Sequence, residues 1–361
     1  MDKIEVAILD VDDHQRYDMA LTEGFKHHNA NIHIYSNFPT QEVRGKQFYK
    51  KNQSIFSHIL STVKSIKDAK RHNVQLLITH LSRLNSKTFC TLAIAKFYGI
   101  ATAVIEHDVA PFIQGEKQYR YRMVYEYLSK HIVLHNRFAY DALLARIPQE
   151  KQAKLCLIKE GNHLEAFEGK KIPKEIAHYK MHLKKDKKYL LFFAPQLQEV
   201  HGLDLLLDAL SLLKDSSIHL LIATQGERFD DYERLIKELG VGDKVHKYLN
   251  PLSDQEIDWL FGASDAIIIP HKEAYENSAI LRATHYALPI IASNVGSQRE
   301  MIVDRFNGLL FDNNDAKALA LAIEHFFTYS YLASDLPREG FKSLRDNYRW
   351  EATAKGYLKL I

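Results

Sequence analysis

The residues best placed to bind a charged ligand follow a short apolar strand in the second half of the chain. The strand, Ile267–Pro270, leads into a polar loop, His271–Asn277, and then into a segment with helical periodicity. Asn277 or Ser278 can cap that helix, whose unpaired N–H groups and dipole attract an anion such as a phosphate. These residue types in this order therefore predict a phosphate-binding loop.

A second loop of the same kind follows the next apolar strand. That strand, Pro289–Ser293, ends at Asn294–Ser297, which opens another helix. Gly296 lets the backbone approach a ligand closely. Any α/β protein joins strands to helices through such loops, so the local physics favours ligand binding and plain connection equally.

The elements that must position these loops alternate along the whole chain. Short apolar runs separated by longer helical stretches indicate parallel βαβ units with both faces of the sheet covered. In the first half the expected strands are Glu5–Leu9, Ile32–Tyr35, Gln75–Thr79, Ala101–Ile105, His131–Leu134 and Leu155–Ile158, with helices at Tyr17–His28, Lys87–Tyr98 and Arg137–Arg146.

A second βα series begins after a polar, basic stretch that contains Pro173, Glu168–Lys188, which we interpret as the interdomain segment. The expected strands of this series are Tyr189–Ala194, His219–Ala223, Val245–Leu249, Ala266–Pro270 and Ile290–Ser293, and its helices are Gly202–Leu213, Phe229–Leu239, Asp254–Phe261 and Ser278–Tyr286.

Chain length agrees with two domains, because 361 residues exceed what one hydrophobic core usually supports. We therefore expect two Rossmann-like, doubly wound α/β domains facing a central cleft. Their expected extents are 1–168 and 189–345, joined by a linker at 169–188. Ligands of such sheets lie beyond the carboxyl ends of the strands.

Composition limits the functional class. The net charge of +3 argues against a nucleic-acid binder of the strongly basic type. The two cysteines, Cys90 and Cys156, indicate neither a disulfide framework nor a zinc site, and they suit a reducing, cytoplasmic compartment. We expect neither a signal peptide nor a membrane span. Basic runs such as Lys180–Lys188 and Arg44–Arg71 are usually solvated faces, but they leave open a peripheral contact with anionic lipid.

Several segments of the second half together resemble one family. The stretch ATHYALP from Ala283, followed by IIASNVGSQREMI and NGLLF, is similar to the donor-binding half of family-4 (group 1) glycosyltransferases of the GT-B fold. Leu191–Leu210 resembles the segment that opens the second domain in that family. Leu221–Glu227, which includes Gly226, resembles the family's Gly-rich turn. Tyr348–Leu360 is similar to the family's terminal helix. The resemblance therefore implies that 346–361 crosses back to the first domain.

The first half resembles the family more loosely. His107 and Asp108 follow the strand Ala101–Ile105, and EHDVAP is similar to the family's His-containing loop at the sugar site. The resemblance implies a catalytic role for both. Asp12, Asp13 and His14 stand where the family has a Gly-rich turn. They could contact acceptor hydroxyls, and capping a helix is an equally good role for either aspartate.

The chain departs from the family's paired glutamates. The second glutamate position falls on Arg282 and the first on Ala274. Glu273 and Glu276 are close enough to accept hydrogen bonds from sugar hydroxyls in place of the first, so we predict that they are catalytic. Arg282 only donates hydrogen bonds and is expected to fork onto a phosphate.

The phosphate-binding cations of the family are also replaced. Gln196 and His201, beside Gly202, stand where the family has arginine and lysine. Gln196 is uncharged, and His201 is cationic only when protonated. Lys272, Arg282 and Arg299 could compensate. The resemblance places base recognition on the backbone near Tyr248 and Asn250.

The predicted function is transfer of a sugar from a nucleotide-sugar donor to a glycan, lipid-linked or protein acceptor. Family precedent implies retention of configuration and no metal; Asp10-Val11-Asp12 spells DxD but lies in the expected acceptor domain. No cofactor besides the donor co-substrate is expected, and the protein is expected to be cytoplasmic or peripheral to the inner membrane face. The replaced residues leave open a non-catalytic subunit that binds sugar, nucleotide or a partner enzyme. A nucleotide-sugar epimerase is a third alternative.

Overall fold

The chain forms two compact α/β units. The computed structural model describes residues 3–11, 14–38, 44–46, 48–50, 53–82, 84–162, 172–225, 229–275 and 278–361. Unit 1 comprises Met1–Asn162 and Tyr348–Ile361, and unit 2 comprises His163–Asn347. Residues 348–361 therefore pack with the first half of the chain, although the whole of unit 2 precedes them in sequence.

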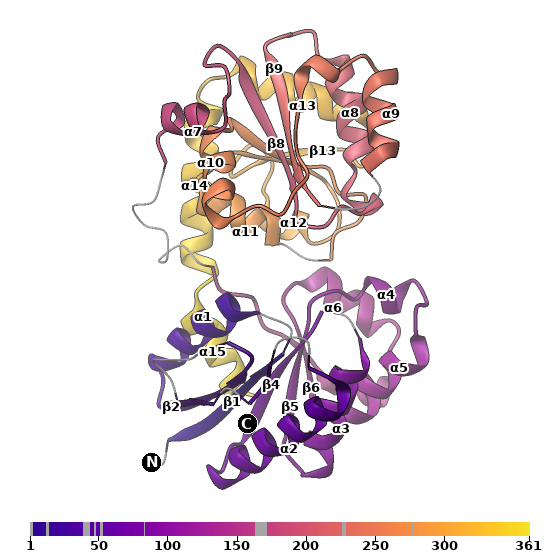
Figure 1. The fold of residues 1–361 in the computed structure, drawn as a ribbon, viewed down its shortest axis with the longest axis vertical. Helices are drawn as coiled ribbons and strands as arrows, with labels where there is room; N and C mark the ends of the chain where they lie inside the picture. The colour runs from indigo at the N-terminus through magenta and orange to yellow at the C-terminus, as the bar shows by residue number, and fades with distance from the viewer. Residues whose placement is uncertain are drawn as a thin grey trace. The chain divides into compact units, whose positions relative to one another are not determined.

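Unit 1 contains a seven-stranded parallel sheet in the order β3-β2-β1-β4-β5-β6-β7 (Figure 1). Its strands are β1 (Ile4–Asp10), β2 (Ala30–Ser36), β3 (Arg44–Lys46), β4 (Leu76–Leu81), β5 (Thr102–Glu106), β6 (His131–Leu134) and β7 (Leu155–Leu157). Its helices are α1 (Gln15–Lys26), α2 (Ile55–Arg71), α3 (Ser86–Phe97), α4 (Ala110–Ile113), α5 (Gln118–Arg122), the π-helix η1 (Met123–Leu128), α6 (Arg137–Leu144), the 3₁₀ turn η2 (Gln149–Lys154) and α15 (Trp350–Leu358).

Alternation along β1 explains how both faces of this sheet are covered. Val6 and Ile8 pack with α1 and with Tyr357 of α15, whereas Ala7 and Leu9 pack with α2 and α3. Successive side chains of a strand point to opposite faces, so the near-continuous apolar run in β1 supplies two cores at once.

Unit 2 contains a six-stranded parallel sheet in the order β10-β9-β8-β11-β12-β13. Its strands are β8 (Lys188–Ala194), β9 (Ile218–Thr224), β10 (Val245–Tyr248), β11 (Ala266–Ile269), β12 (Ile290–Ser293) and β13 (Leu309–Phe311). Its helices are α7 (Lys174–Lys180), α8 (Leu203–Leu212), α9 (Phe229–Glu238), α10 (Asp254–Ala263), α11 (Ser278–His285), α12 (Gln298–Met301), α13 (Ala316–Thr328) and α14 (Leu332–Asn347), with 3₁₀ turns η4 (Glu199–His201) and η5 (Gly242–Lys244).

One face of this second sheet packs on α8, α9 and α13, and the other on α7, α10 and α11 (Figure 1). Leu190 and Phe192 of β8 point into the first core. Tyr189 and Phe193 point the other way, where their rings meet His178 of α7 and Phe261 of α10. The two parallel sheets with helices on both faces confirm the predicted pair of Rossmann-like units.

The polar segment interpreted as a linker is partly helical. Within residues 172–188, α7 packs on α10, and its buried His178 contacts the carbonyl oxygen of Ala263 at 3.0 Å. The polar character of these residues therefore marks a solvated surface of unit 2. The basic run Arg44–Arg71, for which no element was predicted, contains β3 and the 17-residue helix α2.

Candidate functional site

Each sheet has one point where the strand order reverses. In unit 2 it lies between β8 and β11, and in unit 1 between β1 and β4. The loops beyond the carboxyl ends of such strands diverge and leave room for a ligand. In unit 2 these loops contain Gln196, His201, Gly202, Lys272 and Glu273. In unit 1, His14 follows β1, while His107 and Asp108 follow β5, the strand next to β4. Each unit therefore offers one candidate site.

The loop after β8 in unit 2 requires glycine at position 202. Gly202 ends η4 and precedes α8 with φ of +69°, and a Cβ there would lie 2.0 Å from the carbonyl oxygen of Pro270. The amide of Lys272 donates to the carbonyl oxygen of Val200 at 2.8 Å, which joins the same two loops. The first turn of α8 is thereby held beside the end of β11, with N–H groups that have no partner within the helix.

A second glycine holds the other side of the β11 loop. Gly296 has φ of +48°, and a Cβ there would lie 2.0 Å from the carbonyl oxygen of Ala274. That oxygen accepts a hydrogen bond from the amide of Ser297 at 2.9 Å. Ala274, where the family's first glutamate aligns, is thus a buried packing position.

Two histidines belong to these loops, His201 directly before Gly202 and His271 directly after Pro270, and burial favours the neutral form of both rings by lowering their pKa values. The rings of His201 and His271 lie 5.0 Å apart. Burial lowers the pKa of His201, and burial, with a contribution from His201, lowers the pKa of His271 to about 3. His201 Nδ1 accepts from the amide of Gln198 at 3.1 Å, so its Nε2 carries the proton and can donate. His201 can therefore offer a phosphate a neutral donor.

Lys272 supplies a cation to this site, and an acid already partners it. Its Nζ lies 2.7 Å from Asp204 Oδ2 on α8 and 4.0 Å from Glu199 Oε1. Glu199 lies in η4 and Asp204 in the first turn of α8, so the two acids flank Gly202 in the sequence. A phosphate bound there would compete with Asp204 for Lys272.

The remaining predicted donor-site residues differ in their surroundings. The Arg282 guanidinium lies over the ring of Phe193, 5.0 Å from its centroid, while the side chains of Glu273, Gln196 and Asn250 are exposed. The Tyr248 hydroxyl donates to the carbonyl oxygen of Met181 at 3.5 Å, and burial raises its pKa to about 12. Ser278 is the first residue of α11. Gly226, Glu276 and Asn277 lie outside the described residues, as do Asp12 and Asp13 of unit 1.

In unit 1, His107 and Asp108 follow β5 as predicted. The Asp108 amide donates to Glu106 Oε1 at 3.1 Å, and its Oδ1 accepts from the amide of Ala110 at 2.9 Å. Asp108 therefore shapes the turn that leads into α4. Burial raises the pKa of Glu106 to about 8, and the Tyr125 hydroxyl donates to Glu106 Oε2 at 2.5 Å.

His107 belongs to a stack of parallel imidazole rings. Its Nε2 lies 2.8 Å from Nδ1 of His80, at the end of β4, and His80 Nε2 lies 2.9 Å from Asp18 Oδ1 on α1. The ring of His14 stacks on His80 at 4.1 Å and on His107 at 4.9 Å, within 8° of parallel. His14 is itself held by Ser82 Oγ, 2.7 Å from its Nε2, and by Asp10 Oδ2, which accepts from its amide at 2.6 Å.

A fourth histidine, His135 after β6, borders this stack. Its Nδ1 lies 2.8 Å from the carbonyl oxygen of Ile158, which can only accept, so Nδ1 carries the proton. Its Nε2 faces the Tyr17 hydroxyl at 3.2 Å, and that hydroxyl meets Tyr357 of α15 at 3.1 Å. Burial lowers the pKa of His135 to about 4.

Asp18, His80 and His135 were not among the residues predicted from the sequence. One signal could have found the two histidines: a histidine stands at or just after the carboxyl end of β4, β5 and β6 in turn, at positions 80, 107 and 135. The carboxyl ends of adjacent parallel strands share one edge of the sheet, so such residues converge. Asp18 gave no comparable signal, because it lies inside a helix.

His14, His80 and His107 also form a group whose ligand atoms all lie within 4.8 Å of one another, close enough to be considered for a metal ion. The sequence predicted no metal site. The relative orientation of the three rings decides whether their nitrogens can converge on an ion.

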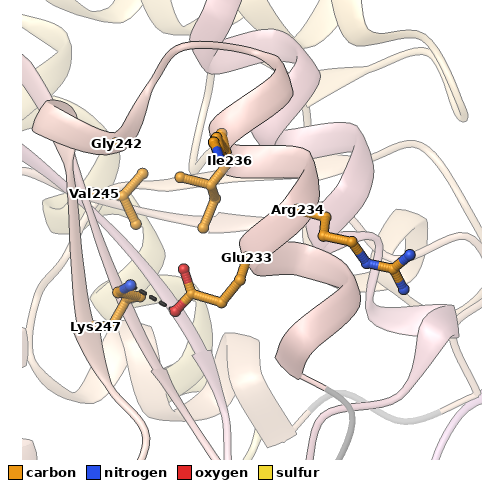
Figure 2. Close-up of a pocket in the computed structure, with 7 residues that line it drawn as sticks. Glu233, Arg234, Ile236, Gly242, Val245 and Lys247 are labelled. Atoms are coloured by element: carbon orange, nitrogen blue, oxygen red, sulfur yellow. Dashed lines mark hydrogen bonds and ion pairs between the residues drawn. The ribbon is translucent and has the colours of Figure 1, made fainter.

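A surface groove on the β10 side of unit 2 lies away from the reversal point. Its volume is about 520 Å³, and it is lined by residues of α9, η5 and β10. Figure 2 shows Lys247 paired with Glu233, and the Nζ atom of Lys247 lies 2.6 Å from the Oε1 atom of Glu233. The side chain of Arg234 points away from Ile236 and Val245. β10 is the edge strand, so this groove belongs to neither reversal-point site.

No helix in the described part of the chain is long and apolar enough to cross a bilayer.

Comparison with known proteins supports the interpretation of unit 2. Residues 175–342 match the family model described as glycosyl transferases group 1. A D-inositol 3-phosphate glycosyltransferase from Arthrobacter sp. (strain FB24) is 26% identical over 173 residues, which cover 46% of this chain and 41% of the relative. The chain thus spans less than half the length of the curated relatives it matches.

Solved structures resemble the whole chain. A glycosyltransferase from Rickettsia africae ESF-5 superposes with a TM-score of 0.73 at 20% identity, covering 98% of this chain and 97% of that one. Anabaena Alr3699/HepE in complex with UDP-glucose gives a TM-score of 0.76 at 13% identity, covering 98% of each. These likenesses establish the GT-B type of fold, and residues 175–342 of the chain match the family model of the group 1 glycosyl transferases.

Proposed function

We propose that this protein transfers a sugar from a nucleotide-sugar donor to a glycan, lipid-linked or protein acceptor. The observation that carries the proposal is the pair of glycines in unit 2. Gly202 and Gly296 clamp the loop after β11 from two sides at the reversal point of a group 1 glycosyl transferase domain. The similar proteins are named as glycosyltransferases, which favours an enzyme over a non-catalytic subunit.

In this proposal the donor diphosphate lies at the first turn of α8. The helix N-terminus, Lys272 and the Nε2–H of His201 supply positive or donating groups there. Departure of a nucleoside diphosphate develops negative charge that fixed donors stabilise. A helix terminus, one lysine and a neutral histidine thus replace the arginine and lysine expected from the family resemblance.

The donor sugar is proposed to contact Glu273 or Glu276, and the acceptor to approach His107. Anabaena Alr3699/HepE was solved in complex with UDP-glucose, which makes a uridine nucleotide sugar the first donor to test. Retention of configuration and independence of metal remain proposals that rest on the family resemblance. The anomeric configuration of the product and turnover in a chelator would test them.

The experiment combines binding and turnover. The protein is incubated with a panel of nucleotide sugars, and donor hydrolysis is measured beside thermal stabilisation by nucleoside diphosphates. We expect stabilisation by one diphosphate and slow hydrolysis of the matching sugar nucleotide. Stabilisation without turnover in every acceptor screen would instead support a sugar- or nucleotide-binding subunit, and an epimerised sugar nucleotide would support an epimerase.

Peripheral membrane contact is the part of the proposal that concerns location. On α2, Ile55, Phe56 and Leu60 are 43%, 69% and 48% exposed, and Lys64, Lys67, Lys70 and Arg71 of the same helix add basic side chains. A helix with exposed apolar and basic side chains suits an anionic lipid surface. A Phe56→Ser, Leu60→Ser double variant should sediment less with vesicles that contain anionic lipid. Leu321→Ser, which changes a 64% exposed leucine of unit 2, is the matched control. If the double variant and the Leu321→Ser control sediment equally with these vesicles, α2 makes no membrane contact.

A further inference from the structure

The contact with Asp18 sets a direction for the hydrogen bonds of His80 and His107 when the Asp18 oxygen is the acceptor. His80 Nε2 faces Asp18 Oδ1 at 2.9 Å, and with a carboxyl oxygen as acceptor His80 carries its proton on Nε2. A neutral imidazole then has a lone pair on Nδ1. His107 Nε2, 2.8 Å away, must therefore donate to that lone pair. The remaining nitrogen of His107, Nδ1, is left as an acceptor.

Buried and stacked groups surround this chain of hydrogen bonds. Asp18 and His80 are 0% and 2% exposed, and His14 covers the faces of both imidazoles in the His80–His107 pair. Asp18 Oδ2 is buried and has no hydrogen-bond partner among the described residues. A proton held on that second oxygen would leave the bond from His80 to Oδ1 unchanged.

The groups around the stack favour neutral imidazoles. Burial, together with the neighbouring His14, lowers the pKa of His80 and outweighs the opposite effect of the Asp10 carboxylate. Burial and His80 lower the pKa of His107. Burial and the carboxyl group of Asp10 raise the pKa of Asp18. The other titratable groups in contact are Tyr17 and His135, which meet the rings edge-on or tilted. Neutral rings keep distinct donor and acceptor nitrogens, which a directed chain of hydrogen bonds requires.

The same geometry does not suit a metal ion. Zinc bound by two imidazoles at about 2.0–2.1 Å in a tetrahedral site holds their nitrogens well over 3 Å apart. The 2.8 Å separation of His80 Nδ1 and His107 Nε2 instead suits a shared proton. Because the rings are nearly parallel, the in-plane lone pairs of His14 cannot converge with those of the pair.

We propose that Asp18 and His80 are positioning residues that fix the tautomer of His107 and leave its Nδ1 as the hydrogen-bond acceptor for a substrate hydroxyl. The role of His107 toward a hydroxyl rests on the proposed function, whereas the tautomer does not. Asp18 and His80 are buried residues that lie outside the proposed donor site, and this proposal gives each of them a role.

Nitrogen NMR of the full chain with labelled histidine tests the tautomer directly. His80→Gln and His107→Gln identify the signals of the two residues. In the wild type we expect His107 and His80 each to be protonated on Nε2 and unprotonated on Nδ1. In Asp18→Leu, His107 should become a mixture of tautomers, while His135, fixed by the Ile158 carbonyl, keeps its proton on Nδ1. An unchanged His107 signal in Asp18→Leu would overturn the proposal. A shift of the His14, His80 and His107 signals on adding Zn²⁺ would also overturn it.

Kinetics test whether the fixed tautomer matters. Asp18→Leu should lower kcat about 10- to 100-fold, shift the pH profile of kcat and leave nucleoside diphosphate binding unchanged. Asp18→Asn, which keeps an acceptor oxygen, should recover most of that loss. Asp68→Leu is the matched control, because Asp68 is a buried aspartate of unit 1 that bonds Tyr35 instead.

The outcomes separate the two proposals. Equal losses in Asp18→Leu and Asp68→Leu would reduce Asp18 to a packing residue. The expected tautomers in a wild-type protein that transfers no sugar would defeat the proposed function and leave the hydrogen-bond order intact.

Discussion

At the scale of single residues, the candidate site depends on polar side chains held neutral by burial. His271 and His201 in unit 2, and His80, His107 and His135 in unit 1, all have lowered pKa values for which burial is the main cause. Such groups donate or accept single hydrogen bonds without carrying charge. This differs from the arginine and lysine pair that the family resemblance implies.

His107 and Glu273 are the residues whose removal should affect turnover most directly. We expect His107→Ala to lower the transfer rate about 100-fold or more, because a positioned acid or base contributes about that much. Glu273→Ala should also abolish most transfer if it holds the donor sugar. Initial rates with the donor that is hydrolysed measure both. His27→Ala, at an exposed histidine of unit 1, is the control. Full activity in either test variant would remove that residue from the site.

Acid should destabilise unit 2 through His271. Its folded pKa of about 3 lies below the unfolded value near 6.5, so the unfolded chain binds the extra proton between these limits. The stability is therefore complete above about pH 6.5 and is lost as the pH falls, by about 1.4 kcal/mol per pH unit. Urea unfolding at pH 6.5 and 5.0 should show a smaller loss for His271→Gln than for the wild type. Identical losses would mean that the His271 ring titrates alike in the folded and unfolded chains.

The residue scale is also where prediction from sequence was weakest. Loop positions such as His107, Lys272 and Gly202 could be proposed because they follow strands or match family positions. Asp18 and His80 could not, because their roles arise from a contact across 62 residues of sequence. Glu273 was chosen for its nearness to the family position, and the structure shows that position, Ala274, packed beneath Gly296.

At the scale of elements, the tight approach of two loops makes Gly202 and Gly296 structural requirements. Gly202→Ala should destabilise unit 2 by about 2–4 kcal/mol, because it adds both a strained positive φ and a clash with Pro270. Denaturant unfolding measures this loss. Gly240→Ala is the matched control, since Gly240 has φ of +66° but no atom within 4 Å of an added Cβ. An equal cost at both positions would show that the backbone angle alone matters.

The start of α10 offers a test that leaves both sites untouched. Ser253 accepts from the amide of Glu256, and the Glu256 carboxylate accepts from the amide of Ser253 at 2.8 Å. Ser253→Ala should cost about 1 kcal/mol through loss of this reciprocal cap. The change is read from the unfolding midpoint of unit 2, and nucleoside diphosphate binding should persist. A variant as stable as the wild type would show that the cap is dispensable.

Eleven strands and seven helices were predictable because their periodicity is local, whereas β3, β13 and the three longest described helices, α2, α13 and α14, were not predicted. Ile290–Ser293 was predicted with its observed ends, and most other strands differ by one or two residues. Helix α2 was not predicted, since the three lysines and one arginine in its C-terminal half indicate a solvated surface, while its buried face is largely small and polar, with Ser61, Thr62 and Ser65. Helix α7 was interpreted as linker for a similar reason.

At the scale of the whole molecule, the fold could be predicted from the sequence. The assignment of the last residues to unit 1 was harder to predict. Alternating apolar strands and amphipathic helices specify a parallel sheet almost anywhere they occur. That the end of the chain returns to unit 1 was suggested only by resemblance to a family, and its packing against α1 was not predicted, because nothing in Trp350–Leu358 itself selects its partner helix.

Removing residues 348–361 should unfold unit 1 selectively. Ala354 and Tyr357 are fully buried in its core, and the main chain of Trp350 lies against Gly24 of α1. Calorimetry of the shortened chain should retain the transition of unit 2 and lose that of unit 1. Two intact transitions would show that α15 is an accessory to unit 1.

The discontinuity of unit 1 also orders events during synthesis. A ribosome makes every residue of unit 2 before it makes α15, whose buried side chains complete the core of unit 1. Unit 2 is continuous in sequence and can mature as it emerges, while the earlier half of unit 1 waits with Phe25 and Ile8 incompletely covered. The part of the chain that is made first therefore cannot complete its core until the residues of α15 have been made.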